Sequence, residues 1–172
     1  MVAVEDELKG RLEEALSGWK QIAILGIGNE FGSDDKLGLL AAQRLKAALP
    51  DMPRVDILAV GSAPENFTGL LRKISPSHVL LIDAAEMGEN AGTISLIEPR
   101  KIEAQIPSTH SISLNVLVEY LEQEISSKVI ILGIQPKKLS FGISVSGEVR
   151  KSVDQLVLVL KQLLGNLSET KV

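Results

Sequence analysis

The chain has 172 residues, a length that fits one compact domain, and 45% of them are hydrophobic, which is enough for a continuous core. Its formal net charge is -4 and no Lys/Arg cluster with interleaved aromatic residues occurs along it, so we do not expect a nucleic-acid binder, which needs cations to displace the counterions of phosphates. The chain contains no cysteine, which excludes disulfides, thiolate nucleophiles and zinc–cysteine sites.

The hydrophobic pattern alternates between helices and strands along the chain. In chain order it predicts a helix at 3–17, a buried strand at 21–27, a helix at 34–48, a strand at 55–60, a helix at 64–74, a buried strand at 79–84, an edge strand at 93–97, a helix at 111–124, a buried strand at 129–134 and a helix at 147–164. Residues 141–145 are typical of either a last strand or a loop. We predict a single domain over residues 1–172, with an N-terminal helical segment at 1–19 and a flexible tail at 165–172.

Strands that alternate with helices favour a sheet between two helical layers. The sequence therefore predicts the α/β class, as a three-layer α/β/α sandwich with a mostly parallel twisted sheet of about five strands. In such folds the site forms where the carboxyl ends of several strands open into a crevice. We therefore look for chemistry in the loops that follow Ile27, Val60, Asp83 and Ile134.

The N-terminal stretch is acidic and amphipathic, whereas a signal peptide begins with basic residues and continues with an apolar run. Every apolar run falls well short of the roughly 20 residues needed to cross a bilayer. We therefore expect a cytoplasmic protein without membrane insertion. We also expect a monomer, although the amphipathic first helix could pack on this subunit or on another.

The glycine-rich stretch GIGNEFGSDD occupies residues 26–35, between a predicted strand and a predicted helix. A dinucleotide-binding loop would need a third glycine where this chain has Phe31. Asp34 and Asp35 would also repel a pyrophosphate at the start of the helix, so nucleotide binding is the weaker interpretation. Ser33 or Asp34 is explained as a helix cap, and the second carboxylate is then available to bind a cation.

Asp83 follows the apolar run VLLI, at the end of a predicted buried strand. It could bond backbone N–H groups in a turn, but an ionised group at that depth favours a partner because unpaired burial is costly. His110 lies in the polar segment PSTHSIS, which we expect to be a loop ahead of a helix. It could be a surface histidine, yet with Asp35 and Asp83 it completes a set of metal ligands. His78 is interpreted as structural or exposed.

Hydrolysis assisted by a metal ion suits these residues, because the chain has neither a cysteine nor a GxSxG elbow to provide a nucleophile. A cation polarises the scissile carbonyl or activates water, and the protein only needs to supply ligands. Nitrogen and oxygen ligands accept nickel, zinc and several other divalent ions, so the residue types alone do not name the metal.

Five segments in order along the chain resemble the hydrogenase maturation proteases, and more narrowly the hydrogenase 3 type. They are GIGNEFGSDDKLG (26–38), GSAPEN (61–66), LLIDAAEMGENAG (80–92), STHSISLN (108–115) and LGIQP (132–136). Each segment is weak alone, but five in order are specific. The resemblance implies that Asp35, Asp83 and His110 are both catalytic residues and metal ligands. Family members often have glycine where this chain has Lys36.

The resemblance also implies a substrate and a metal. Such proteases remove a short C-terminal extension from the large-subunit precursor of a nickel–iron hydrogenase after nickel has been inserted. The nickel ion would then be supplied by the precursor or shared with it, and other divalent ions could substitute. Glu65, Asn66 and Gln135 are candidates for substrate contact, although helix-dipole compensation explains Glu65 and Asn66 about as well. A metal-binding module that binds the precursor without cutting it, and a nucleotide-binding protein, stay open as alternatives.

Overall fold

The computed structural model of the protein describes residues 2–169, apart from the side chains of residues 2–5, 108, 109, 113 and 167–169. Its centre is a sheet of five strands in the order β2-β1-β3-β5-β4. The strands are β1 (Ile22–Ile27), β2 (Val55–Gly61), β3 (His78–Ala84), β4 (Ile94–Ile97) and β5 (Lys128–Ile134). The pairs among β1, β2, β3 and β5 are parallel, whereas β4 runs antiparallel to β5 at the sheet edge. The predicted mostly parallel sheet and its edge strand are therefore confirmed.

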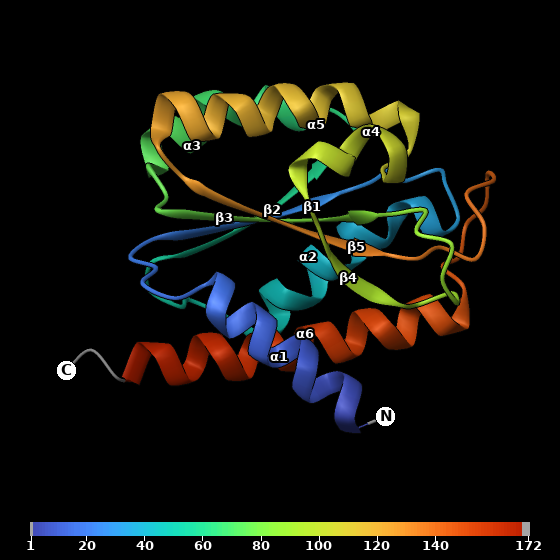
Figure 1. The fold of residues 1–172 in the computed structure, drawn as a ribbon, viewed down its shortest axis with the longest axis horizontal. Coiled ribbons are helices and arrows are strands. Elements are labelled where there is room, and N and C mark those ends of the chain that lie inside the picture. The colour runs from blue at the N-terminus through green and yellow to red at the C-terminus, as the bar shows by residue number, and fades with distance from the viewer. Residues whose placement is uncertain (1, 170–172) are drawn as a thin grey trace.

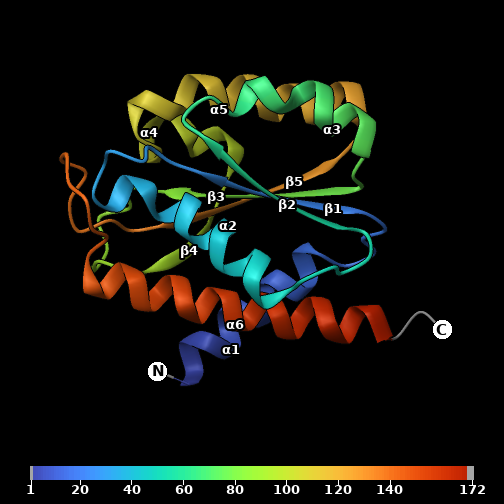
Figure 2. The ribbon, with the colours of Figure 1, turned by 180° about the vertical axis from the view of Figure 1, so that it is seen from behind.

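Helices cover both faces of the sheet, as Figures 1 and 2 show from opposite sides. One face carries α1 (Val2–Ala15), α2 (Leu37–Ala48) and α6 (Gly147–Glu169), and the other carries α3 (Thr68–Ile74), α4 (Ile102–Gln105) and α5 (Ser108–Tyr120). The predicted three-layer sandwich is confirmed. No helix in residues 2–169 is long and apolar enough to span a membrane.

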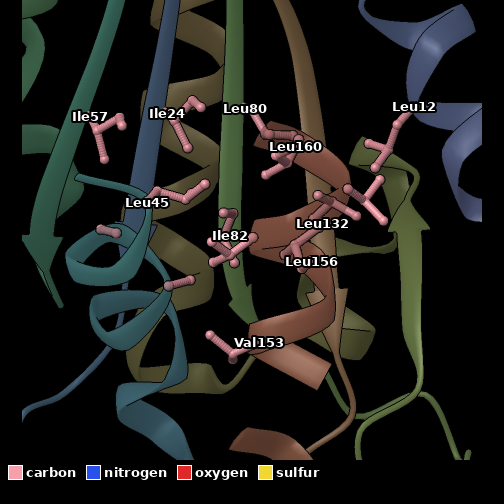
Figure 3. Close-up of a cluster of buried hydrophobic side chains, with 14 of the residues drawn as sticks. Leu12, Ile24, Leu45, Ile57, Leu80, Ile82, Leu132, Val153, Leu156 and Leu160 are labelled. Carbon is pink, nitrogen blue, oxygen red and sulfur yellow. The ribbon is translucent and has the colours of Figure 1, made fainter. Parts of the chain in front are cut away.

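The core has two halves, one on each face of the sheet, because successive side chains of a strand point to opposite faces. Ile24 and Leu80 belong to the half beneath α1, α2 and α6, whereas Leu25 and Leu81 belong to the half beneath α3, α4 and α5. Figure 3 shows the first half, where side chains of α6 such as Leu156 meet those of the central strands. The strands are therefore buried on both faces, as their unbroken apolar runs predict.

Two of the predicted helices begin with a tighter turn. A 3-10 turn, η1 (Asp34–Lys36), precedes α2, and another, η2 (Pro64–Phe67), precedes α3. Helix α5 begins at Ser108, three residues earlier than predicted, and continues into a π-helical segment, η4 (Leu121–Ile125). The short elements η3 (Pro99–Lys101) and α4 were not predicted, because so few residues show no helical periodicity.

Near the C-terminus the structure decides between two alternatives for one segment and extends one helix. Of the two alternatives for residues 141–145, a strand or a loop, the structure shows the loop, with an isolated bridge between Phe141 and Gly32. Helix α6 continues through Gly165 to Glu169, five residues beyond its predicted end, and the flexibility of the tail from residue 165 stays a prediction. A glycine costs a helix only about 1 kcal/mol relative to alanine, which the packing of Leu160 and Leu164 against the sheet offsets. Residues 170–172 lie outside the described part of the chain.

Candidate active site

Three predicted site residues from distant parts of the chain meet at the carboxyl edge of the sheet. Asp35 lies in η1 after β1, Asp83 is the second-last residue of β3, and His110 lies at the start of α5. Nδ1 of His110 is 3.3 Å from each carboxylate oxygen of Asp83. Nε2 of the same ring is 3.8 Å from Oδ2 of Asp35. The predicted convergence of the two acids and the imidazole is therefore present in the fold.

The fold hides these side chains from solvent. Asp83 and His110 are fully buried, and Asp35 is 7% exposed. Two of their polar atoms, Nε2 of His110 and Oδ1 of Asp35, are buried without a hydrogen-bond partner. The gap of 3.8 Å between Nε2 and Oδ2 is too long for a hydrogen bond. Since buried polar atoms in native proteins nearly always have partners, this oxygen and this nitrogen are suited to bind a ligand such as a metal ion.

Asp83 is held in place by the centre of the sheet. Its strand is paired on both sides, with β1 and with β5. Oδ1 of Asp83 accepts a hydrogen bond of 2.8 Å from the backbone N–H of Ala84. His110 does not lie in a loop, as the sequence predicted, but in the first turn of α5, where its N–H donates to the carbonyl of Pro107. The helix start therefore presents the imidazole ring to the strand end.

Glycines allow the loop after β1 to bring Asp35 against the sheet. A Cβ atom on Gly38 would come within 2.0 Å of the carbonyl oxygen of Ile27 and 2.4 Å of that of Ile82, so only glycine lets α2 begin so close to β1 and β3. A Cβ atom on Gly32 would come within 2.5 Å of the Cβ atom of Asp35. The loop therefore lies directly on the Asp35 side chain and limits where it can point.

The three groups perturb one another. Burial raises the pKa of Asp35, and the charge of His110 opposes that rise. Burial also raises the pKa of Asp83, against the hydrogen bond and charge of His110. Burial alone would lower the pKa of His110, but the hydrogen bond to Asp83 and the charges of both acids outweigh it and raise that pKa. Perturbed pKa values that cluster in one place are typical of functional sites.

The three side chains do not form a ready-made metal site. In the described residues no group of three or more His, Asp and Glu side chains has the spacing to hold a metal ion. The reason is the position of the ring, whose Nδ1 faces Asp83 while Nε2 faces Asp35. Asp83 holds and orients the imidazole, as carboxylates commonly do behind a metal-binding histidine. Direct ligation by all three residues stays a prediction and requires the ring to turn.

Asp34 was predicted as a possible helix cap, which the structure contradicts. Neither Ser33 nor Asp34 makes a capping hydrogen bond at η1. The fully buried carboxylate of Asp34 instead accepts hydrogen bonds from the backbone N–H groups of Lys137, Lys138 and Ser146, at 2.8, 3.0 and 2.6 Å, and from the Ser146 hydroxyl at 2.9 Å. Asp34 therefore joins the loop after β1 to the loop after β5. The sequence could not reveal this, because the donors lie more than 100 residues away.

The predicted substrate-contact residues differ in their surroundings. Asn66 is exposed, and Oε2 of Glu65 is buried without a hydrogen-bond partner. Gln135 is buried, and its Oε1 accepts from the N–H of Met87 at 2.7 Å while its Nε2 donates to Oε2 of Glu86 at 3.0 Å. Gln135 therefore braces the loop after β3. Substrate contact by Glu65, Asn66 and Gln135 stays a prediction.

His78 lies at the start of β3, whereas Asp83 lies near its end. The side chain is 7% exposed, and its Nδ1 is 3.1 Å from Oγ of Ser77. Burial lowers the pKa of His78, and the charge of Lys128 lowers it further. The exposed interpretation of His78 is therefore wrong, and the structural one stays a prediction.

Comparisons with known proteins identify the family of this chain. A model of the hydrogenase maturation protease family matches residues 40–162. A putative hydrogenase maturation protease of Methanocaldococcus jannaschii is 34% identical over 95% of this chain and all of its own length. The hydrogenase 3 maturation protease of Escherichia coli K12 is 34% identical over 83% of this chain and 90% of its own length.

Solved structures give the same result. The crystal structure of a NiFe hydrogenase maturation protease from Thermococcus kodakarensis KOD1 superposes with a TM-score of 0.81 at 30% identity, covering 90% of this chain and 99% of that chain. The solution structure of an Escherichia coli endopeptidase of the same type has a TM-score of 0.73 at 33% identity, covering 83% and 90%. Because the family model spans most of the chain and a relative at 34% identity matches 95% of it, this protein belongs to the hydrogenase maturation protease family.

Proposed function

We propose that this protein is a nickel-dependent endopeptidase that removes the C-terminal extension from the large-subunit precursor of a hydrogenase after nickel has been inserted. The proposal combines membership of the family with one observation, the convergence of Asp35, Asp83 and His110 at the carboxyl edge of the sheet. Two atoms there that can ligate a metal ion, Oδ1 of Asp35 and Nε2 of His110, are buried without hydrogen-bond partners. The nickel ion belongs to the precursor and is therefore part of the substrate.

Asp35 and His110 are the residues that would bind the ion. Carboxylate oxygen and imidazole nitrogen both suit nickel, and a divalent cation would satisfy the two partnerless atoms. Such an ion would supply Lewis acidity to the scissile carbonyl group of the precursor. Asp83 would act on His110: with the Nδ1 proton donated to its carboxylate, the neutral ring would direct the electron pair of Nε2 toward Asp35.

The burial of the site supports selectivity. Asp83 and His110 are fully buried, so an unbound peptide in solution does not reach them directly. Binding of the precursor would therefore have to open a path to these side chains. A site that opens only for a large, specific partner protects other proteins from cleavage.

The test is the mass of a purified large-subunit precursor, with and without nickel, after incubation with the protein. Wild type is expected to shorten the nickel-loaded precursor and leave the nickel-free one intact. Asp35→Asn, Asp83→Asn and His110→Ala are each expected to abolish cleavage, whereas His78→Gln, at the other end of β3, should cleave normally. Normal processing by any of the three site variants would refute the assignment, and binding without a change of mass would favour a non-enzymatic metal-binding module.

A further inference from the structure

Two loops beside the candidate active site pair to form a short ribbon, made of residues 29–34 and 138–145. The N–H of Ser33 donates to the carbonyl of Ser140 at 2.9 Å, and the N–H of Gly142 donates to the carbonyl of Phe31 at 3.0 Å. Both views of the fold show the loop before η1 alongside the loop before α6. With Asp34 bonded across the base, as described above, the ribbon is a fixed feature of the surface.

The ribbon exposes large apolar side chains. Phe31 is 66% exposed, Phe141 88% and Ile143 98%. The chain has only three phenylalanines, so two of the three lie on this small surface. Burying them in the core would have stabilised the fold, and their grouping on a fixed ribbon therefore marks a surface that contacts another molecule.

A cavity of about 260 Å³ lies between the ribbon and the starts of α2 and α6. Its lining includes Leu39, Leu40 and Ile143, together with the cations Lys36 and Arg150. Nζ of Lys36 donates to the carbonyl of Ile143 at 3.1 Å, and Nη2 of Arg150 donates to that of Val145 at 3.4 Å.

The cavity is suited to an anionic group. Among the side chains that the structure describes, no carboxylate forms a salt bridge with Lys36 or Arg150. Glu30 contributes a single negative charge to the lining, so the cations outnumber it. The cavity thus combines apolar walls with a net positive charge, which is complementary to an apolar peptide segment that carries a carboxylate.

We propose that the ribbon and this cavity form one docking surface for the large-subunit precursor, which seats an apolar segment bearing a carboxylate there. This inference rests on the proposed function. The surface is continuous with the candidate site, because Gly32 of the ribbon lies against Asp35 and Lys36 directly follows it. A C-terminal extension always ends in a free carboxylate, which the cavity cations can receive while the preceding chain passes Asp35.

The test uses the full-length protein and nickel-loaded precursor, and measures KM and kcat separately. Phe31→Ser and Phe141→Ser are each expected to raise KM about tenfold, the lower end of what burying such a side chain contributes. Arg150→Glu is expected to raise KM at low ionic strength, with a smaller effect in high salt. Leu158→Ser, which removes an exposed leucine from α6 (60% exposed), is the matched control and should leave KM unchanged.

The outcomes separate this inference from the proposed function. Cleavage by wild type together with unchanged KM values in the ribbon variants would overturn the docking surface alone. If wild type does not cleave, titration of fluorescently labelled precursor measures docking without cleavage, and equal affinities for wild type and Phe141→Ser would overturn it. A second copy of this chain is the other possible occupant of the ribbon, and light scattering tests for it by measuring the molar mass in solution. A wild-type dimer that Phe141→Ser converts to a monomer would show that the ribbon binds that second copy and would overturn the docking of the precursor.

Discussion

Replacing Asp34 with alanine is the sharpest test of how the candidate site is held together. The carboxylate accepts four hydrogen bonds, from three backbone N–H groups and one hydroxyl, and it is fully buried. Lys137 and Lys138 are exposed residues, so we assume that water replaces the carboxylate at their N–H groups. The two bonds from Ser146, which is only partly exposed, are harder to replace.

The magnitude follows from those two bonds. Hydrogen bonds to a charged group contribute about 1.5–3 kcal/mol each, so losing both from Ser146 should lower the free energy of unfolding by about 3 kcal/mol at least. Asp34→Asn should lose less, because it keeps one acceptor oxygen but turns an NH2 group toward N–H donors. Glu13→Ala on the exposed face of α1 is the control, with an expected change within about 0.5 kcal/mol.

Urea unfolding at pH 7, followed by far-UV circular dichroism, gives the free energy of unfolding for the three variants and wild type. The slope against urea should stay constant, because the change is local. A loss below about 1 kcal/mol for Asp34→Ala would show that the loops do not depend on this carboxylate. The reasoning about the fixed ribbon would then fail as well.

Two further predictions concern the loop over Asp35 and the buried histidine. Gly32→Ala would place a methyl group within 2.5 Å of the Cβ atom of Asp35, so precursor processing, followed by mass spectrometry, should slow at least about tenfold. Gly69→Ala is the control, because its added methyl group meets open space and should leave the rate unchanged. Equal rates for the two variants would contradict the close approach of Gly32 to Asp35. His78 has a lowered pKa, so below about pH 6.5 the unfolded chain binds a proton that the folded protein does not, and wild type should lose stability as the pH falls. Between pH 7.5 and pH 5, the urea midpoint of His78→Gln should therefore fall less than that of wild type. Parallel plots of midpoint against pH for the two proteins would refute a lowered pKa of His78.

The layers of the fold could be predicted because they follow from local patterns. The run IAILGI (22–27) has no polar face, and a strand of that kind must be covered on both sides, which already requires a three-layer arrangement. The position of Asp83 could be predicted for the same reason, since it directly follows an apolar strand. The place of His110 was predicted less well, because a polar segment such as PSTHSIS is compatible with a loop or with a first helical turn.

The pairing between loops could not be predicted. Residues 138–145 have no periodic pattern, and their conformation is determined by hydrogen bonds to Phe31, Ser33 and Asp34, far away in the sequence. Gln135 illustrates the same limit, because an amide after a strand end fits a crevice equally well whether it contacts substrate or braces a neighbouring loop. Only the positions of Glu86 and Met87 decide that its hydrogen bonds go to the loop.

Asp34 and Asp35 show how tertiary structure separates two residues that the sequence presents as equivalent. Both are acids in the same 3-10 turn, and both are buried. Four donors saturate Asp34, whereas Asp35 keeps a buried oxygen without a partner and faces a histidine nitrogen that also has none. A saturated acid can only hold structure, because binding a ligand would mean breaking bonds already made. Burial of Asp35, whose oxygen has no partner, costs free energy that a bound cation would remove. Asp34, next to it in the chain, holds the loop that keeps Asp35 in that position.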